Sequence, residues 1–192
     1  MGDDMGGERE AASESIQGLS NVTGGFAVKD FSVRPAVPQD AVAICGLVHE
    51  LARANGEQTR LAPEFVTRYL CSPGCAALVA EAGGRVIGFL SYHIHPNLYH
   101  AGSTALIEEC VVSADSRGRG VGRELVLAAV EAAERAGCEE ISVSTMFEND
   151  GAQRFYRSLG FGDDALLLEI HFDRCKPADS GCVCDEGTSA GT

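Results

Sequence analysis

Glycines and a pair of carboxylates gather in one short segment, and they are the residues of this chain best suited to chemistry. Gly118, Gly120 and Gly122 alternate with larger residues, and the pair Glu108-Glu109 lies just upstream. Glycine allows a tight turn and leaves the backbone N–H uncovered, while the start of a helix carries a partial positive charge. A strand that leads through such a loop into a helix therefore predicts a binding site for a phosphate or pyrophosphate.

Two common phosphate-binding patterns do not describe this loop. A nucleoside-triphosphate loop closes on Gly-Lys-Ser or Gly-Lys-Thr, whereas Gly122 is followed by Arg123-Glu124. A dinucleotide fingerprint would accommodate Gly118 and Gly120, but its third glycine position is occupied by Arg123, whose bulk opposes close packing of helix on strand. Both patterns are therefore disfavoured.

The elements expected around the loop form a mixed sheet. Apolar runs predict strands over residues 31–34, 77–81, 85–93, 104–112, 140–145 and 166–172. Helical spacing predicts helices that begin at Pro38, Pro63 and Val121, and a last one over 152–159. In the second helix, Phe65, Val66 and Leu70 form the expected buried side. The order of strands and helices predicts an α/β fold with a mixed sheet and helices on both faces.

The length and the composition indicate one domain between two tails. Residues 1–25 and 176–192 contain few large apolar side chains, and such segments bury too little surface to offset the entropy of ordering. We therefore expect disordered tails at 1–25 and 176–192 around a domain at 26–175.

Charge and cysteine content exclude several classes of protein. The net charge is -13, with 15 basic against 28 acidic residues, which disfavours a nucleic-acid partner and favours a cationic one. The N-terminal sequence lacks the apolar stretch of a secretion signal, and we find no run of membrane-spanning length. The 8 cysteines lack the spacing of a zinc site, so we expect reduced thiols, no metal and a cytoplasmic protein.

The segment Arg117-Gly118-Arg119-Gly120-Val121-Gly122 resembles the Arg-x-x-Gly-x-Gly signature of the GNAT (Gcn5-related N-acetyltransferase) superfamily. A second stretch of that family is matched further on by Asn149, Ala152, Phe155-Tyr156 and Leu159-Gly160-Phe161. The resemblance implies a mostly antiparallel sheet with a splayed parallel pair, and acetyl-CoA as cosubstrate. It implies coenzyme contacts from Cys110, Val111, Val112, Arg117, Gly118, Arg119, Gly120, Val121, Gly122, Asn149 and Tyr156.

The activity implied is N-acetyl transfer to a primary amine by direct attack in a ternary complex. An alkyl ammonium titrates near ~10, so a base must take its proton at neutral pH. Glu108 and Glu109 are alternatives for this base, because neighbours on a strand point to opposite faces unless a bulge intervenes. Tyr156 is the expected general acid for the leaving thiolate, and a backbone N–H near Val112 the expected oxyanion donor.

The run from Ile107 to Val112 looks most like the diamine (spermidine/spermine) acetyltransferase branch, in which the first carboxylate, here Glu108, is the base. Tyr92 is expected in the substrate groove beside the two glutamates, and Cys110 is expected to be a buried thiol without a covalent role. The alternatives are a protein-lysine or N-terminal acetyltransferase and a non-catalytic acetyl-CoA-binding regulator. The resemblance also raises the expectation of a homodimer.

Overall fold

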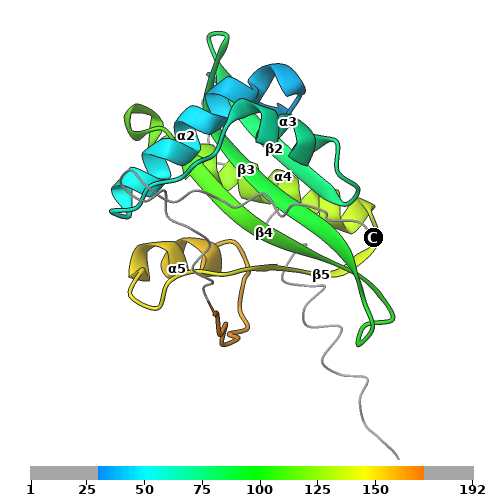
Figure 1. Cartoon of the computed structure of the whole chain (residues 1–192). Coiled ribbons are helices and arrows are strands. Elements are labelled where there is room, and N and C mark those ends of the chain that lie inside the picture. Colours follow the sequence, from blue (N-terminus) through cyan, green and yellow to red (C-terminus); the bar gives the residue numbers. More distant parts are fainter. Residues whose placement is uncertain (1–29, 171–192) are drawn as a thin grey trace, which may run out of the picture. The chain divides into compact units, whose positions relative to one another are not determined.

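The computed structural model describes residues 30–170, and these contain a five-stranded mixed sheet (Figure 1). Strands β1 (Ser32–Pro35), β2 (Cys75–Ala82), β3 (Arg85–Asn97) and β4 (Gly102–Val112) pair with one another in sequence order and antiparallel. Strand β5 (Cys138–Val143) pairs with β4 in parallel. The predicted mixed sheet, mostly antiparallel with one parallel pair, is confirmed.

Helices cover both faces of this sheet (Figure 1). Helices α2 (Ala41–Ala54) and α3 (Pro63–Leu70) pack on one face, and α4 (Val121–Arg135) packs on the other. Two short 3-10 helices, η2 (Pro38–Asp40) and η3 (Ala114–Ser116), precede α2 and α4. None of the helices within residues 30–170 is both long and apolar enough to span a membrane.

Alternation along the strands creates the two cores. On β2, Leu78 and Ala80 pack toward α4, whereas Val79 between them packs toward α2 and α3. Since successive side chains of a strand leave opposite faces, one apolar run supplies both layers. Leu90 and Phe89 of β3 divide in the same way.

Helix α4 approaches the sheet closely at Gly88 of β3. A Cβ added to Gly88 would lie 3.0 Å from the carbonyl oxygen of Val111 and 3.2 Å from Cγ1 of Val121. Any side chain at this position would therefore push the start of α4 away from the sheet. Because Gly88 has no side chain, the first turn of α4 and the glycine loop before it can pack against the end of β4.

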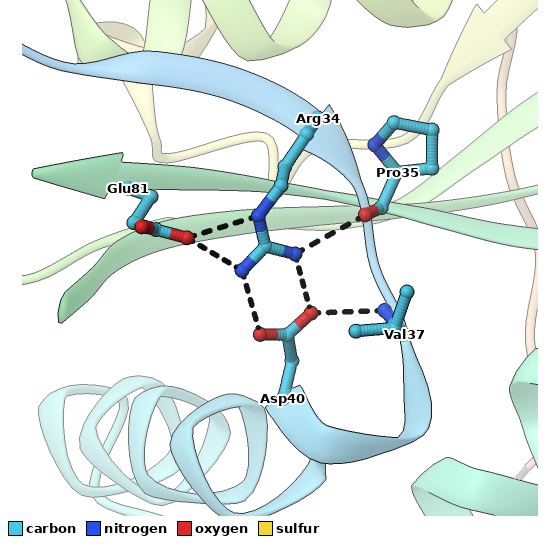
Figure 2. Close-up of polar contacts among 5 residues, drawn as sticks. All are labelled: Arg34, Pro35, Val37, Asp40 and Glu81. Carbon is cyan, nitrogen blue, oxygen red and sulfur yellow. Dashed lines mark hydrogen bonds and ion pairs between the residues drawn. The ribbon is translucent and has the colours of Figure 1, made fainter. Parts of the chain in front are cut away.

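An ion-pair network joins β1, β2 and the start of α2 (Figure 2). The guanidinium of Arg34 donates to both carboxylate oxygens of Asp40, at 2.7 and 2.9 Å, and to Oε2 of Glu81 at 2.6 and 2.9 Å. Asp40 also accepts from the N–H of Val37 and is buried. These bonds to Arg34 hold the pKa of Asp40 below its usual range.

The chain divides into two compact units, Met1–Gly162 and Asp163–Thr192. The predicted strand over 166–172 is wrong for 166–170, because residues 163–170 contain no strand and pair with none among the described residues. Apolar composition alone does not make a strand, which needs a hydrogen-bonded neighbour. Residues 171–172 and the predicted tails 1–25 and 176–192 lie outside the described residues, so the domain limits stay predictions.

Candidate active site

Strand β4 carries an extra residue at Glu108. Ser91 pairs with Glu109 and Tyr92 pairs with Ile107, so Glu108 has no counterpart on β3. Such a β-bulge interrupts the alternation of side chains. Glu108 and Glu109 consequently line the same cavity, although in a regular strand they would point to opposite faces.

The cavity has a volume of about 350 Å³ and lies on the face of the sheet that α2 and α3 cover. This size is at the lower end of the range for small-molecule sites, roughly 300–1,000 Å³. Its lining combines polar groups from β3 and β4 with apolar side chains from the helices: Ile44, Val48, Thr59, Leu61, Phe65, Val66, Tyr69, Leu70, Cys75, Ala77, Phe89, Ser91, His93, Glu108 and Glu109.

Glu109 is the more enclosed of the two carboxylates. It accepts a hydrogen bond from the hydroxyl of Ser91, and its own N–H donates to the Ser91 Oγ at 3.2 Å. Burial raises the pKa of Glu109, and the charge of Glu108 adds to this effect, while the bond from Ser91 opposes it. Glu109 therefore holds a proton at higher pH than an ordinary glutamate, as a general base near neutral pH requires.

Glu108 contacts a histidine across the strands. Its Oε1 lies 3.0 Å from Nδ1 of His93, and both side chains are partly exposed. The ring of His93 lies beside that of His95, with 4.9 Å between centroids, and Nε2 of His95 is 3.3 Å from Oγ1 of Thr104. Within residues 30–170, no group of three or more side chains is arranged to hold a metal ion.

Tyr69 of α3 was not among the residues predicted for the site. It lines the cavity, and its hydroxyl donates to the carbonyl of Tyr92 at 3.1 Å. Burial raises its pKa, and the nearby Cys75 and the two glutamates add to the shift. A signal for Tyr69 exists in the sequence, because it lies three residues after Val66, the buried residue of this helix. The predicted burial of Phe65 is wrong, since its side chain is exposed.

The structure does not bring the side chain of Tyr92 into this cavity. Tyr92 is buried in the cluster that packs against α4, on the other face of the sheet. Its neighbours Ser91 and His93 line the cavity instead. The expectation that Tyr92 contacts substrate is therefore corrected, and the physical reason is the alternation of side chains along β3.

Tyr156 belongs to α5 (Asp150–Arg157) and contacts β4 from the α4 side of the sheet. Its hydroxyl is hydrogen-bonded with the thiol of Cys110, and its ring packs edge-on against Phe155 and Phe161. Burial raises the pKa of Tyr156, and burial raises the pKa of Cys110 to about 12. Both groups are thus protonated at neutral pH, which equips Tyr156 to donate a proton and leaves Cys110 without a thiolate.

Strands β4 and β5 separate beside these residues. Their pairing ends at Ile107 and Val143, so β4 continues to Val112 with no strand of residues 30–170 beside it on that side. Ser113 donates its N–H to Ile87, and Glu109 donates its own to Ser91. The main-chain groups of the intervening residues, Cys110 and Val112, consequently face the open edge.

The glycine loop follows directly at the end of β4. Gly118 and Gly120 have positive φ values of 74° and 82°, in the left-handed region that glycine adopts without strain. Gly120 is the N-cap of α4, so the first N–H groups of this fifteen-residue helix are directed at the loop. Arg117 donates from Nε to the carbonyl of Val112 at 3.1 Å, and Arg119 pairs with Asp30.

Asn149 caps helix α5. Its Oδ1 accepts the N–H of Ala152 at 3.0 Å, which fixes the start of the helix that carries Tyr156. Capping of α5 is thus the role of Asn149 that the structure shows, and its role in coenzyme binding stays a prediction. The open edge of β4 thus lies between a cavity with two carboxylates and a helix with a protonated phenol.

Comparison with known proteins agrees with this arrangement. Residues 46–161 match the model of the acetyltransferase (GNAT) family. The chain belongs to this family and is therefore an acyltransferase of the N-acetyltransferase type.

Individual relatives cover different shares of the chain. An aminoalkylphosphonate N-acetyltransferase of Salmonella typhimurium is 30% identical over 129 residues, which are 67% of this chain and 83% of the relative. A mycothiol acetyltransferase of Pseudarthrobacter chlorophenolicus is 31% identical, and the match spans 68% of this chain but 42% of that protein. Among solved structures, a transcriptional regulator from Bacillus halodurans superposes with a TM-score of 0.67 at 27% identity, covering 74% of this chain and 99% of its own.

Proposed function

We propose that this protein transfers the acetyl group of acetyl-CoA to a primary amine by direct attack within a ternary complex. The observation that carries the proposal is the position of the open edge of β4. On one side of the strand, Glu108 and Glu109 line a cavity of suitable size for an amine. On the other side, Tyr156 is held against Cys110 of the same strand. An acceptor and a donor that approach from opposite sides would meet at this edge.

The residues around the edge suit a coenzyme with a diphosphate and an amide-containing arm. The loop at residues 117–122 contains two glycines with positive φ, Gly118 and Gly120. This loop and the start of α4 offer N–H groups to an anion. The main-chain groups of Cys110 and Val112 are the partners we assign to the arm, together with Val111 on the same strand. When bound, acetyl-CoA would supply an acyl thioester beside these groups.

Glu109 is the base that we assign, because its enclosed position and raised pKa suit proton transfer near neutral pH. It takes a proton from the ammonium, and the neutral amine then attacks the carbonyl carbon. Glu108, which lies 3.0 Å from His93 and is partly exposed, adds a second carboxylate that attracts the cationic acceptor. This assignment differs from the resemblance to diamine acetyltransferases, which implies Glu108 as the base.

Tyr156 is the acid that we assign. The C–S bond breaks as the amide forms, and the departing thiolate takes the phenolic proton. The amide nitrogen releases its second proton to solvent, and Glu109 then releases the proton that it took from the ammonium. The phenol is reprotonated from solvent after release of the products. Because burial keeps Cys110 protonated, a covalent acyl-cysteine is not part of the proposal.

The nature of the acceptor is supported less directly. The relatives' names include an aminoalkylphosphonate and a mycothiol acetyltransferase, whose acceptors are small molecules. The diamine preference implied by Ile107-Glu108-Glu109 rests on the resemblance alone. A protein lysine or an N-terminal amine is the alternative acceptor.

The test is release of free thiol from acetyl-CoA in the presence of a panel of primary amines. Wild-type protein is expected to turn over at least one amine, and Cys110→Ala is expected to retain turnover. Binding of coenzyme A without turnover of any amine would instead identify a non-catalytic acetyl-CoA-binding regulator. Lack of coenzyme binding by calorimetry would contradict the proposal altogether.

A further inference from the structure

We infer that the acceptor is a primary amine with a single cationic group and an apolar body. This inference rests on the proposed function and deepens it by naming the substrate class. It follows from the uneven distribution of polar groups in the cavity of about 350 Å³.

The polar groups of the cavity come from two neighbouring strands. Ser91 pairs directly with Glu109 in the register of β3 and β4, and His93 contacts Glu108. Tyr69 of α3 lines the same cavity, and its hydroxyl donates to the carbonyl of Tyr92, the residue between Ser91 and His93. The carboxylates are therefore concentrated at one place on the sheet, where they would hold a single ammonium group.

The remaining wall is apolar. It is formed by α2, α3 and the segment before α3, and apart from Thr59 it consists of Ile44, Val48, Leu61, Phe65, Val66 and Leu70. Among the described residues that line the cavity, Glu108 and Glu109 are the only carboxylates. A ligand that extends from the glutamates toward the helices thus meets hydrocarbon.

A linear diamine fits this distribution poorly. Its second ammonium group would leave water for a wall without a counter-charge, and an unpaired charge is costly to bury. The two glutamates cannot serve both ends of such a molecule, because they are consecutive residues at one bulge. A monoamine with an alkyl or aryl body instead gains from burial of each methylene.

The decisive comparison is between 1-aminopentane and 1,5-diaminopentane, which have the same chain length and differ in the second amine. Thiol release from acetyl-CoA gives kcat/KM for each. We expect the monoamine to be favoured at least about tenfold, and kcat/KM to rise by roughly fourfold per methylene from aminopropane to aminopentane. Equal or better turnover of the diamine would overturn the inference, and so would a preference for the N-terminal amine of a peptide over both.

Failure of the proposed function looks different in this assay, because no amine would then release thiol. Turnover of the diamine in preference to the monoamine leaves the acetyltransferase function intact and removes only the apolar-body inference. The two results are therefore distinguishable within one experiment.

A variant of the wall supplies a second measurement. Thr59 lines the cavity, and its Oγ1 accepts the N–H of Leu61 at 3.2 Å. Thr59→Asp retains an oxygen acceptor and places a carboxylate on the wall, so it should shift the ratio of kcat/KM toward 1,5-diaminopentane by about tenfold. Gln58→Asp makes the same charge change at the neighbouring exposed residue, which does not line the cavity, and should leave the ratio unchanged. An equal shift in both variants would contradict the inference, since it would reflect net charge alone.

Discussion

Nδ1 of His93 lies 3.0 Å from Oε1 of Glu108, so the extra residue of strand β4 is held by a side chain of β3. The contact gives the two consecutive glutamates different surroundings. Glu108 lies against an imidazole and is partly exposed, whereas Glu109 is enclosed beside Ser91 and has a raised pKa. Different surroundings suit different roles, with one carboxylate attracting the cation and the other accepting its proton.

Glu109→Gln should lower kcat/KM at neutral pH by about 10² to 10⁴, because it removes the assigned general base. In the wild type, kcat/KM should fall as the pH drops through the raised pKa of Glu109, which lies above 4.5. The variant should lose this acidic limb. Steady-state kinetics across pH measure both effects, with Glu108→Gln as the matched variant, expected to lose about tenfold or less. A larger loss in Glu108→Gln would reverse the assignment of the two glutamates.

Glu109→Gln should also stabilise the fold at neutral and alkaline pH. The pKa of Glu109 is raised in the folded state, so the folded protein binds more protons than the unfolded chain between the two pKa values. Its contribution to stability is present below 4.5 and is lost as the pH rises through the folded pKa. Urea unfolding should find Glu109→Gln more stable than wild type at about pH 8, with the difference smaller at about pH 4. If Glu109→Gln is less stable than wild type at the higher pH, then burial of the charged Glu109 carboxylate does not destabilise the fold.

Tyr156→Phe should lower kcat by about 10² while leaving the affinity for coenzyme A nearly unchanged. The substitution removes the phenolic proton donor and retains the ring that packs against Phe155 and Phe161. Stopped-flow or steady-state thiol release measures kcat, and calorimetry measures binding. If kcat is unchanged, Tyr156 serves only packing and the thiolate leaves without its help.

Asp40→Asn should lower the free energy of unfolding by about 2 kcal/mol at neutral pH, because it weakens the charged hydrogen bonds from Arg34. The folded pKa of Asp40 is depressed, so this stability is present above 3.8 and is lost as the pH falls through the folded value. Chemical denaturation of wild type and Asp40→Asn, at neutral pH and at a pH below the folded pKa of Asp40, measures how the difference in stability depends on pH. Asp30→Asn removes an exposed ion pair with Arg119 and should cost less than about 1 kcal/mol. Equal losses in the two variants would argue against a special role for the network in Figure 2.

Gly120→Ala should destabilise the protein by about 1 kcal/mol and weaken coenzyme binding, because φ at this position is +82°. A Cβ there meets no atom within 4 Å, so the backbone conformation and not a clash causes the loss. Gly122→Ala is the control for stability, since φ at Gly122 is not positive and its Cβ would lie 3.6 Å from Phe155 and Val112. Thermal unfolding and calorimetry with coenzyme A measure the two effects. Equal destabilisation by both substitutions would contradict the argument from φ.

Much of the architecture was accessible from local patterns. The helix starts at Pro38, Pro63 and Val121 were predicted from proline, glycine and apolar spacing, and each helix is present. The strands predicted over 77–81 and 85–93 are present and pair with each other, and the parallel pair implied by the resemblance is β4 with β5. The strand predicted over 166–172 is wrong for 166–170, because apolar composition does not reveal whether a partner strand is available.

The site was predicted only in part. The glycine loop and the glutamates were found from residue type and spacing, and Tyr156 from the family resemblance. The structure places Tyr156 and Glu109 on opposite sides of β4. Tyr92 was expected in the substrate groove beside the glutamates, but alternation along β3 turns its side chain to the other face. Tyr69 was missed, because its place in the cavity depends on how α3 packs on the sheet.

The amino-acid sequence by itself determined where the chain turns, which faces of its helices are apolar and where bare N–H groups can meet an anion. These properties depend on residues that are close in sequence. Only the tertiary structure decided that Glu108 and Glu109 share one cavity, because the bulge arises from the register between β3 and β4. It likewise decided which tyrosines face the cavity. Register and packing are set by contacts between distant segments, which local spacing does not encode.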